Sequence, residues 1–203
     1  MRTVTYHLYR SPLSRGYWAE AGRSLRELRC MLFAALMIAG CIVLARFKIP
    51  VGENLSVSIT FLCRALCALV YGPLGGMVFG AAEDTLSFFL SSGGYPYFPG
   101  YALTTMLGCL IYALCFYRTR ITIRRIILAK VLTNIQNVFL GSLWSAMLYS
   151  KGYLYYMTTS AVKNIFYLPV QILLLVIVFQ KLLPLLQRQH LIPCQMEGDQ
   201  IPW

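Results

Sequence analysis

Long apolar runs are the feature that most constrains how this chain can fold. They occupy residues 30–46, 57–71, 73–92, 101–117, 125–149 and 160–183. A run of about 20 mostly apolar residues lets a helix cross the hydrocarbon core of a bilayer. Hydrophobic residues make up 58% of the chain and charged residues 12%, which leaves too few polar side chains to cover the surface of a soluble protein. We therefore predict an all-α integral membrane protein with six transmembrane helices.

The positions of lysine and arginine predict the orientation of these helices. Cytoplasmic loops of membrane proteins carry an excess of Lys and Arg. In the six-helix arrangement, Arg46, Lys48 and Lys151 fall in loops on one side, whereas twelve cations fall on the other. These twelve are Arg2, Arg10, Arg15, Arg23, Arg26, Arg29, Arg118, Arg120, Arg124, Arg125, Lys181 and Arg188. Both termini are therefore predicted to be cytoplasmic, and the net charge of +11 is explained without a nucleic-acid partner.

The same pattern divides the chain into three parts. We predict a basic cytoplasmic lead-in at residues 1–29, a membrane domain at 30–183 and a cytoplasmic tail at 184–203. Most of the seven cysteines lie within apolar runs, which is typical of small buried side chains. The two histidines, His7 and His190, both fall in the polar ends of the chain. No metal site, cofactor or catalytic residue is predicted.

Charged residues inside the apolar runs are the first candidates for function, because they are costly in a membrane. Arg64 lies in the second run, and Glu83 and Asp84 lie in the third. Three glycines at intervals of four precede these acids: Gly72, Gly76 and Gly80. Because such glycines allow helices to approach closely, we predict an intramembrane ion pair between Arg64 and one of the two acids. The second acid remains open to another role.

Polar and aromatic residues of the last two runs predict a binding pocket. Within each run they share one helical face, and an aromatic loop precedes the fourth run. The candidate ligand contacts are Tyr97, Phe98, Asn134, Asn137, Trp144, Lys163, Asn164 and Tyr167. Aromatic faces stack on flat ligands, and amides bind the polar edges of such ligands. The alternative is that these amides only form hydrogen bonds between helices.

Four segments resemble the folate-type substrate-binding (S) components of energy-coupling-factor (ECF) vitamin transporters. They are Tyr71-Gly72-Pro73-Leu74-Gly75-Gly76 with the preceding stretch 57–62, Gly80-Ala81-Ala82-Glu83-Asp84, the loop 94–104 containing Tyr97-Phe98-Pro99-Gly100, and Val162-Lys163-Asn164 with Leu168-Pro169-Val170-Gln171. Their order and spacing cover about residues 30–183.

The resemblance implies a six-helix unit that captures a vitamin from outside a bacterial cell. Such units dock on a transmembrane coupling subunit that carries two ATPases. Their first helix commonly presents an Ala-x-x-x-Ala surface for docking, which Ala35 and Ala39 match. The resemblance therefore favours docking over internal packing for this pair. It also implies a plasma-membrane location and a folate-like substrate.

Two departures from the family pattern bear on the substrate. Ser160 stands where members often have an arginine, and Gly141 and Ser142 replace Asn-Thr before Leu143-Trp144. A different vitamin is therefore the first alternative. More distant alternatives are a proton-coupled carrier and an integral membrane enzyme, both using Glu83 and Asp84.

Overall fold

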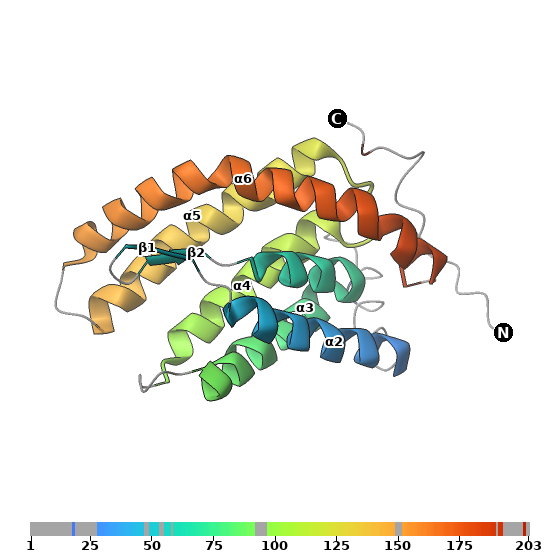
Figure 1. Ribbon diagram of the computed structural model, residues 1–203, viewed down its shortest axis with the longest axis horizontal. Helices are drawn as coiled ribbons and strands as arrows, with labels where there is room; N and C mark the ends of the chain where they lie inside the picture. The colour runs from blue at the N-terminus through green and yellow to red at the C-terminus, as the bar shows by residue number, and fades with distance from the viewer. Residues whose placement is uncertain are drawn as a thin grey trace.

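The computed structural model describes residues 18, 28–46, 49–52, 55–57, 59–91, 97–148, 152–189, 191–192 and 201. These residues form a helical bundle with one short β-hairpin (Figure 1). The elements are α2 (Leu28–Arg46), β1 (Ile49–Gly52), β2 (Leu55–Val57), α3 (Phe61–Ser91), α4 (Pro99–Phe116), α5 (Ile123–Leu148) and α6 (Tyr153–Arg188).

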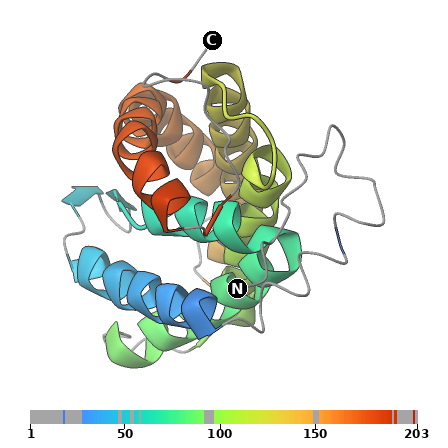
Figure 2. The same cartoon turned by 90° about the vertical axis from the view of Figure 1, so that its right-hand side faces the viewer.

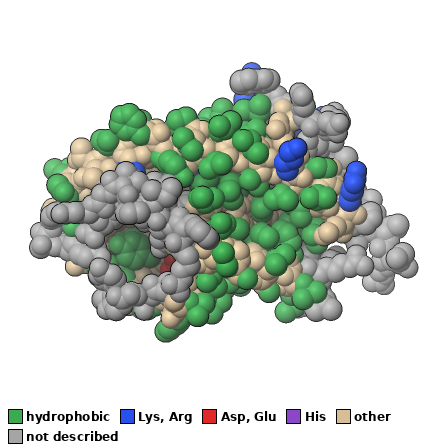
Figure 3. Space-filling view, in the orientation of Figure 1, with side chains coloured by type: hydrophobic (Ala, Val, Ile, Leu, Met, Phe, Trp, Pro, Cys, Tyr) green, Lys and Arg blue, Asp and Glu red, His purple; other side chains and the backbone are tan. Residues whose placement is uncertain are grey.

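The described helices have the composition of membrane spans. Four of them, α3 to α6, are long and apolar enough to cross a bilayer, and Met31–Ala45 of α2 forms a shorter apolar helix. Large apolar side chains cover the outside of the bundle, as Figure 3 shows for one face. Phe89 and Phe166, for example, are 73% and 79% exposed. Such a surface suits lipid, so the predicted helical membrane protein is confirmed at this level.

Helix α3 contains a chain reversal rather than one straight span. Gly72 has φ 72° and ψ −165°, values outside the helical region, and Pro73 follows it. Glycine adopts positive φ without the steric cost that other residues have. The break between the apolar runs 57–71 and 73–92 is thus a turn at Gly72-Pro73, and α3 consists of two helical segments, residues 61–71 and 73–91. The first is about 16 Å long at 1.5 Å per residue, about half the thickness of the hydrocarbon core.

Helix α6 is longer than predicted. It has 36 residues, where the apolar run suggested 160–183. At 1.5 Å per residue its length is about 54 Å, more than a bilayer core requires. Pro169 and Pro184 lie inside it without ending it. The predicted boundary at residue 183 is therefore not a helix end.

The helices pack on one another in chain order, α2 on α3, α3 on α4, α4 on α5 and α5 on α6. In the end view of Figure 2, α3 runs between α2 and the layer of α5 and α6. A Cβ added to Gly80 would lie 3.2 Å from the backbone of α4 at Met106 and Thr105, so this glycine allows close contact. Gly76 lies against both the second apolar run, at Ala68, and α4, at the Cys109 carbonyl, whereas Gly80 packs against α4.

Both ends of the described bundle carry further structure. β1 and β2 pair antiparallel, with Ile49 opposite Val57, so the stretch that precedes α3 contains a strand. At the other end, Leu186, Ile192 and Ile201 are buried in the main hydrophobic cluster. Part of the predicted tail 184–203 thus packs against the membrane domain. Most of the lead-in 1–29 lies outside the described residues.

Candidate functional site

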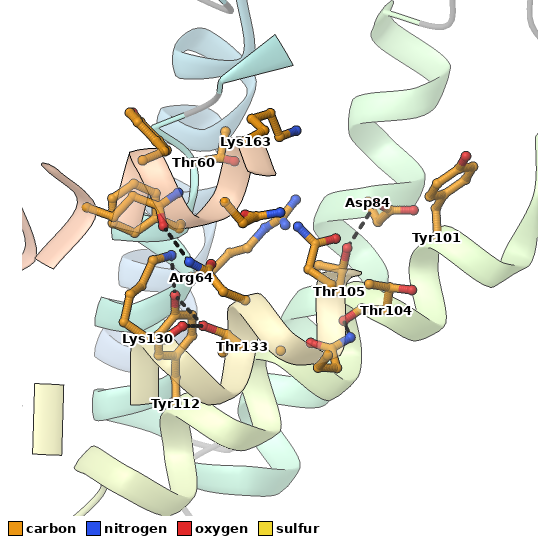
Figure 4. Close-up of a pocket in the computed structure, with 18 residues that line it drawn as sticks. Thr60, Arg64, Asp84, Tyr101, Thr104, Thr105, Tyr112, Lys130, Thr133 and Lys163 are labelled. Atoms are coloured by element: carbon orange, nitrogen blue, oxygen red, sulfur yellow. Dashed lines mark hydrogen bonds between the residues drawn. The ribbon is translucent and has the colours of Figure 1, made fainter. Parts of the chain in front are cut away.

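A cavity of about 300 Å³ lies between α3, α4, α5 and α6 (Figure 4). It begins at Thr60 and Phe61, directly after the β-hairpin, so the start of α3 forms part of its wall. Its lining is rich in hydroxyl, amide and charged groups. The lining residues are Thr60, Phe61, Arg64, Asp84, Tyr101, Thr104, Thr105, Gly108, Tyr112, Lys130, Thr133, Asn134, Gln136, Asn137, Lys163, Asn164, Tyr167 and Gln171.

The chain reversal in α3 creates an ion pair beside this cavity. Arg64 Nη2 lies 2.8 Å from Glu83 Oε2, and Arg64 Nε donates to the same oxygen at 2.9 Å. Glu83 is 1% exposed and also accepts a hydrogen bond from Ser87. In a straight helix these two residues would be about 28 Å apart along the axis, so the pair depends on the turn at Gly72. The hydrogen bond from Nε and the ion-pair contact from Nη2 to the same carboxylate oxygen let the two charges neutralise each other in a nonpolar setting.

Asp84 has a different position from its neighbour. Its Oδ1 accepts a hydrogen bond from Thr105 Oγ1 of α4 at 3.2 Å, and its side chain lines the cavity. Successive residues of a helix are rotated by about 100°. Glu83 therefore neutralises Arg64, while Asp84 presents a carboxylate to the cavity. Of the two acids left open by the sequence, the structure pairs Glu83.

A buried lysine stands at one end of the cavity. Lys130 of α5 is 3% exposed, and its Nζ donates to Tyr112 Oη at 3.0 Å. The same nitrogen lies 3.9 Å from the centre of the Phe61 ring, a cation–π contact. Thr133 also donates to Tyr112 Oη, at 3.4 Å. We call the group of Lys130, Tyr112, Phe61 and Thr133 the inner end of the cavity.

Five of the eight predicted ligand contacts line the cavity: Asn134, Asn137, Lys163, Asn164 and Tyr167. Two of them also make structural hydrogen bonds. Asn134 Nδ2 donates to Gln171 Oε1 at 3.2 Å, and Asn164 Nδ2 donates to the Ser160 carbonyl at 2.8 Å. The two arrangements considered from the sequence, a pocket wall and hydrogen bonds between helices, therefore occur on the same helical face. Their contact with a ligand stays a prediction.

The other three predicted contacts, Tyr97, Phe98 and Trp144, are absent from the lining. Trp144 Nε1 donates to Thr104 Oγ1 at 2.8 Å, and its ring packs on Phe98 at 5.5 Å between centroids. A Cβ on Gly100 would lie 2.7 Å from Trp144, so a glycine is needed at this contact. These aromatic rings hold the start of α4 against α5. Tyr97 instead packs on Phe88, with its ring centroid 5.1 Å away.

Charge in the cavity is dominated by cations. Arg64, Lys130 and Lys163 line it, and Glu83 neutralises the first of these. Two lysines then remain against the carboxylate of Asp84. A cavity of this kind binds ligands that carry negative charge together with groups for hydrogen bonding. The described residues contain no group of three or more His, Cys, Asp or Glu side chains that could hold a metal ion.

Several lining residues were not predicted from the sequence. Lys130 lies inside the fifth apolar run, but we did not count it among the intramembrane charges. A lysine within such a run is itself the signal, because it is costly in lipid. Tyr112 and Thr105 gave no comparable signal. Similar residues occur all along apolar helices, and only the packing of α4 places these two at the cavity.

The predicted docking pair lies on the outside of the bundle. Ala35 and Ala39 are exposed on α2, beside exposed Leu32 and Leu36. Small side chains on an exposed apolar helix form a flat surface on which another membrane helix can pack. The structure is therefore compatible with docking. It does not use these two alanines in its own core.

Comparison with known proteins identifies the family. The sequence profile described as "ECF-type riboflavin transporter, S component" matches residues 27–188. The chain belongs to this family of S components. It is therefore a transporter subunit and not an enzyme, which excludes the membrane-enzyme alternative.

Individual relatives agree with this assignment. The folate transporter FolT of Clostridium novyi (strain NT) is 27% identical over 147 residues, which cover 72% of this chain and 85% of the relative. FolT of Leuconostoc mesenteroides subsp. mesenteroides is 30% identical over 154 residues, with coverage of 72% and 82%. A solved structure entitled "Crystal structure of FolT bound with folic acid" superposes with a TM-score of 0.67, at 25% identity, over 73% of this chain and 91% of that one.

Proposed function

We propose that this chain is the folate-binding S component of a bacterial ECF importer. The observation that carries the proposal is the polar cavity between α3 and α6, in a chain whose relatives are named folate transporters. The solved neighbour of similar fold is described as bound to folic acid. Folic acid combines a flat heterocycle, which has donors and acceptors on its edges, with a tail that carries two carboxylates. The amides and cations of the cavity match both parts.

Lys163 is the residue we assign to the carboxylate end of the ligand. It lines the cavity near the start of α6 and is partly exposed, so it can meet a carboxylate that keeps some of its water. Asn137 and Tyr167 line the same wall. We assign Asn134, Asn164 and Tyr167 to the ligand's polar edges. The three aromatic residues outside the lining would act by shaping the mouth of the cavity, or they would reach the ligand after a rearrangement on binding. They are Tyr97, Phe98 and Trp144.

Riboflavin is the second candidate substrate, since the family description names it. It also has a flat heterocycle, but it carries no carboxylate. The two lysines of the cavity favour an anionic ligand and therefore folate over riboflavin. Because Ser160 and Gly141 depart from the folate-type pattern, a direct comparison of the two vitamins is the appropriate test.

We further propose six crossings of the bacterial plasma membrane with both termini in the cytoplasm. The two segments of α3 would be two of these crossings, which enter and leave on the same side of the membrane with the turn at Gly72 between them. Arg118, Arg120, Arg124 and Arg125 stand at the junction of α4 and α5, and Arg188 stands at the last turn of α6. The clearest Lys and Arg side chains in Figure 3 lie toward the end at which α6 finishes. This end would be cytoplasmic.

Delivery of the vitamin would require the partners typical of the family, a transmembrane coupling subunit and its two ATPases. We place their contact at Ala35 and Ala39 of α2. Ala35→Trp adds a bulky ring to this flat surface and should abolish folate uptake in cells while leaving folate binding by the purified chain unchanged. Lost binding would instead show that the surface supports the pocket. Gly152→Ala is a suitable control, because nothing lies within 4 Å of the added Cβ.

The substrate is tested by purifying the chain from a medium that contains several vitamins. After denaturation, mass spectrometry of the released small molecules should find a folate at about one per chain. Titration of the emptied protein should then show tighter binding of folic acid than of riboflavin. Recovery of riboflavin, or tighter binding of it, would transfer the assignment to the second candidate. Binding of neither vitamin would remove the folate proposal.

A further inference from the structure

Lys130 is a buried cation that has no carboxylate partner among the described residues. Within the described part of the chain, no carboxylate lies within 4.0 Å of its Nζ, and the ion pair found there joins Arg64 to Glu83. Its contacts are Tyr112 Oη and the ring of Phe61. An ammonium group has three N–H donors, and the hydrogen bond to Tyr112 uses one of them. Since Lys130 lines the cavity, a bound ligand can accept another.

Such an arrangement is unfavourable in the absence of a ligand. A charge that is removed from water without a partner destabilises the folded chain, and a hydrogen bond to a neutral hydroxyl compensates only part of the loss. A ligand acceptor at Nζ would recover some of it. Hydrogen bonds to charged groups are also stronger than those between neutral groups. Lys130 is thus suited to binding, and its cost in the empty state is otherwise unexplained.

The two lysines stand at opposite ends of the cavity. The hydrogen bond between Asn134 of α5 and Gln171 of α6 marks one level of these antiparallel helices. Lys130 precedes Asn134 by one helical turn, whereas Lys163 precedes Gln171 by about two turns in the opposite direction. Their backbones are therefore about 18 Å apart along the bundle. Figure 4 shows the two lysine side chains on different sides of the cavity. Each lysine therefore meets a different part of a bound ligand.

The groups that line the cavity together with Lys130 suit a heterocycle better than a glutamate tail. Lys130 is a donor, Asp84 is an acceptor when ionised, and the amides of Asn134 and Gln171 can do both. A dicarboxylate would bring two hydrated charges to a place with one lysine. A flat ring with donors on one edge and acceptors on another loses less hydration there. The carboxylates then remain near the partly exposed Lys163.

We propose that Lys130 donates from Nζ to the 4-oxo group of a pterin ring bound at the inner end of the cavity. Resting on the proposed folate function, this inference names an unassigned specificity residue and the orientation of the ligand. The 4-oxo oxygen is the strong acceptor of the ring, and the 2-amino group with its neighbouring ring nitrogen forms the donor side. Figure 4 shows Lys130 and Asp84 on different sides of the cavity, so the contact assigned to Lys130 is with the 4-oxo oxygen alone.

A matched pair of ligands tests this contact. Folic acid and its 4-amino analogue differ at the position in question, where an acceptor is replaced by a donor, and at the neighbouring ring nitrogen, which loses its hydrogen. The wild-type protein should bind folic acid at least tenfold more tightly. Lys130→Met should weaken folic acid binding by roughly 10- to 100-fold, the range for a hydrogen bond to a charged group, and should leave the analogue within about threefold. Binding is measured by titration of tryptophan fluorescence or by calorimetry.

The controls separate the possible outcomes. Lys130→Arg should retain most of the preference, and Lys181→Met, at an exposed position on α6, should change nothing. Pteroic acid, which lacks the glutamate, should lose affinity in Lys130→Met as folic acid does. Three results would overturn the inference. The first is that Lys130→Met weakens binding of folic acid and of the 4-amino analogue equally, and the second is that the wild-type protein does not prefer folic acid. The third is that Lys130→Met weakens binding of folic acid but not of pteroic acid. A wild-type protein that binds no folate overturns the proposed function itself.

Discussion

Helices α3 and α6 solve the problem of polar groups in a membrane in two different ways. α3 reverses at Gly72, buries most of its surface and joins Arg64 to Glu83 across the turn. α6 continues past two prolines and exposes much of its surface, and a polar stripe of Lys163, Asn164, Tyr167 and Gln171 faces the cavity. Changes in α3 should therefore alter stability, whereas changes on the polar stripe of α6 should alter binding. The predictions below test this contrast.

The largest effect is expected at the ion pair of α3. Glu83→Gln leaves the Arg64 charge without its carboxylate and should destabilise the chain by about 3 kcal/mol, toward the lower end for buried pairs because Arg64 is 27% exposed. Thermal unfolding of the ligand-free protein in detergent measures the loss. Arg64→Met combined with Glu83→Leu removes both charges and should recover most of it. Unchanged stability in Glu83→Gln would mean that the pair does not support the fold.

The turn within α3 should be the next most sensitive point. In Gly72→Ala a Cβ is forced into positive φ and meets the Tyr117 ring at 2.9 Å, so we expect a loss of about 1–3 kcal/mol. The same unfolding measurement applies, with Gly152→Ala as the matched change at an open position. If both variants unfold at the wild-type temperature, the reversal does not depend on glycine.

A smaller and different effect is expected on the polar stripe of α6. Lys163→Met should weaken folic acid binding by about tenfold, since it removes a partly exposed charge that we assign to a carboxylate. Pteroic acid binding, without the glutamate, should change little. Titration of both ligands gives the comparison, and the unfolding temperature should stay the same. If Lys163→Met lowered the stability of the chain and left its affinity for folic acid unchanged, Lys163 would support the fold, as the residues of α3 are expected to do.

The smallest effect is expected on the outer face of α6. Phe166 is 79% exposed, and Phe166→Ala should change stability and folate affinity by less than about 0.5 kcal/mol. A membrane helix surrounded by lipid loses little when one apolar side chain becomes smaller, because lipid fills the space. A drop in uptake with normal binding would show that this face contacts a partner.

The sequence predicted the helices better than the site. Apolar runs and the Gly72-Pro73 turn predicted the helical segments to within a few residues, except at the ends of α6. Five lining residues were also predicted, because polar residues at helical spacing are conspicuous in an apolar run. Lys130 could have been found in the same way. Trp144 and Phe98 could not have been separated from the lining, since whether an aromatic ring faces a cavity or a neighbouring helix depends on packing.

By itself the sequence determined that this chain is a helical membrane protein and which side chains carry charge within it. Both properties follow from hydropathy along the chain, because a long apolar run favours a membrane helix regardless of which helices pack beside it. The tertiary structure decided which acid binds Arg64, and it placed Lys130 and Asp84 across one cavity. Those relations arise from the reversal at Gly72 and from the close approach of α3 to α4. Contacts between segments distant in the chain follow from packing geometry, which no local pattern contains.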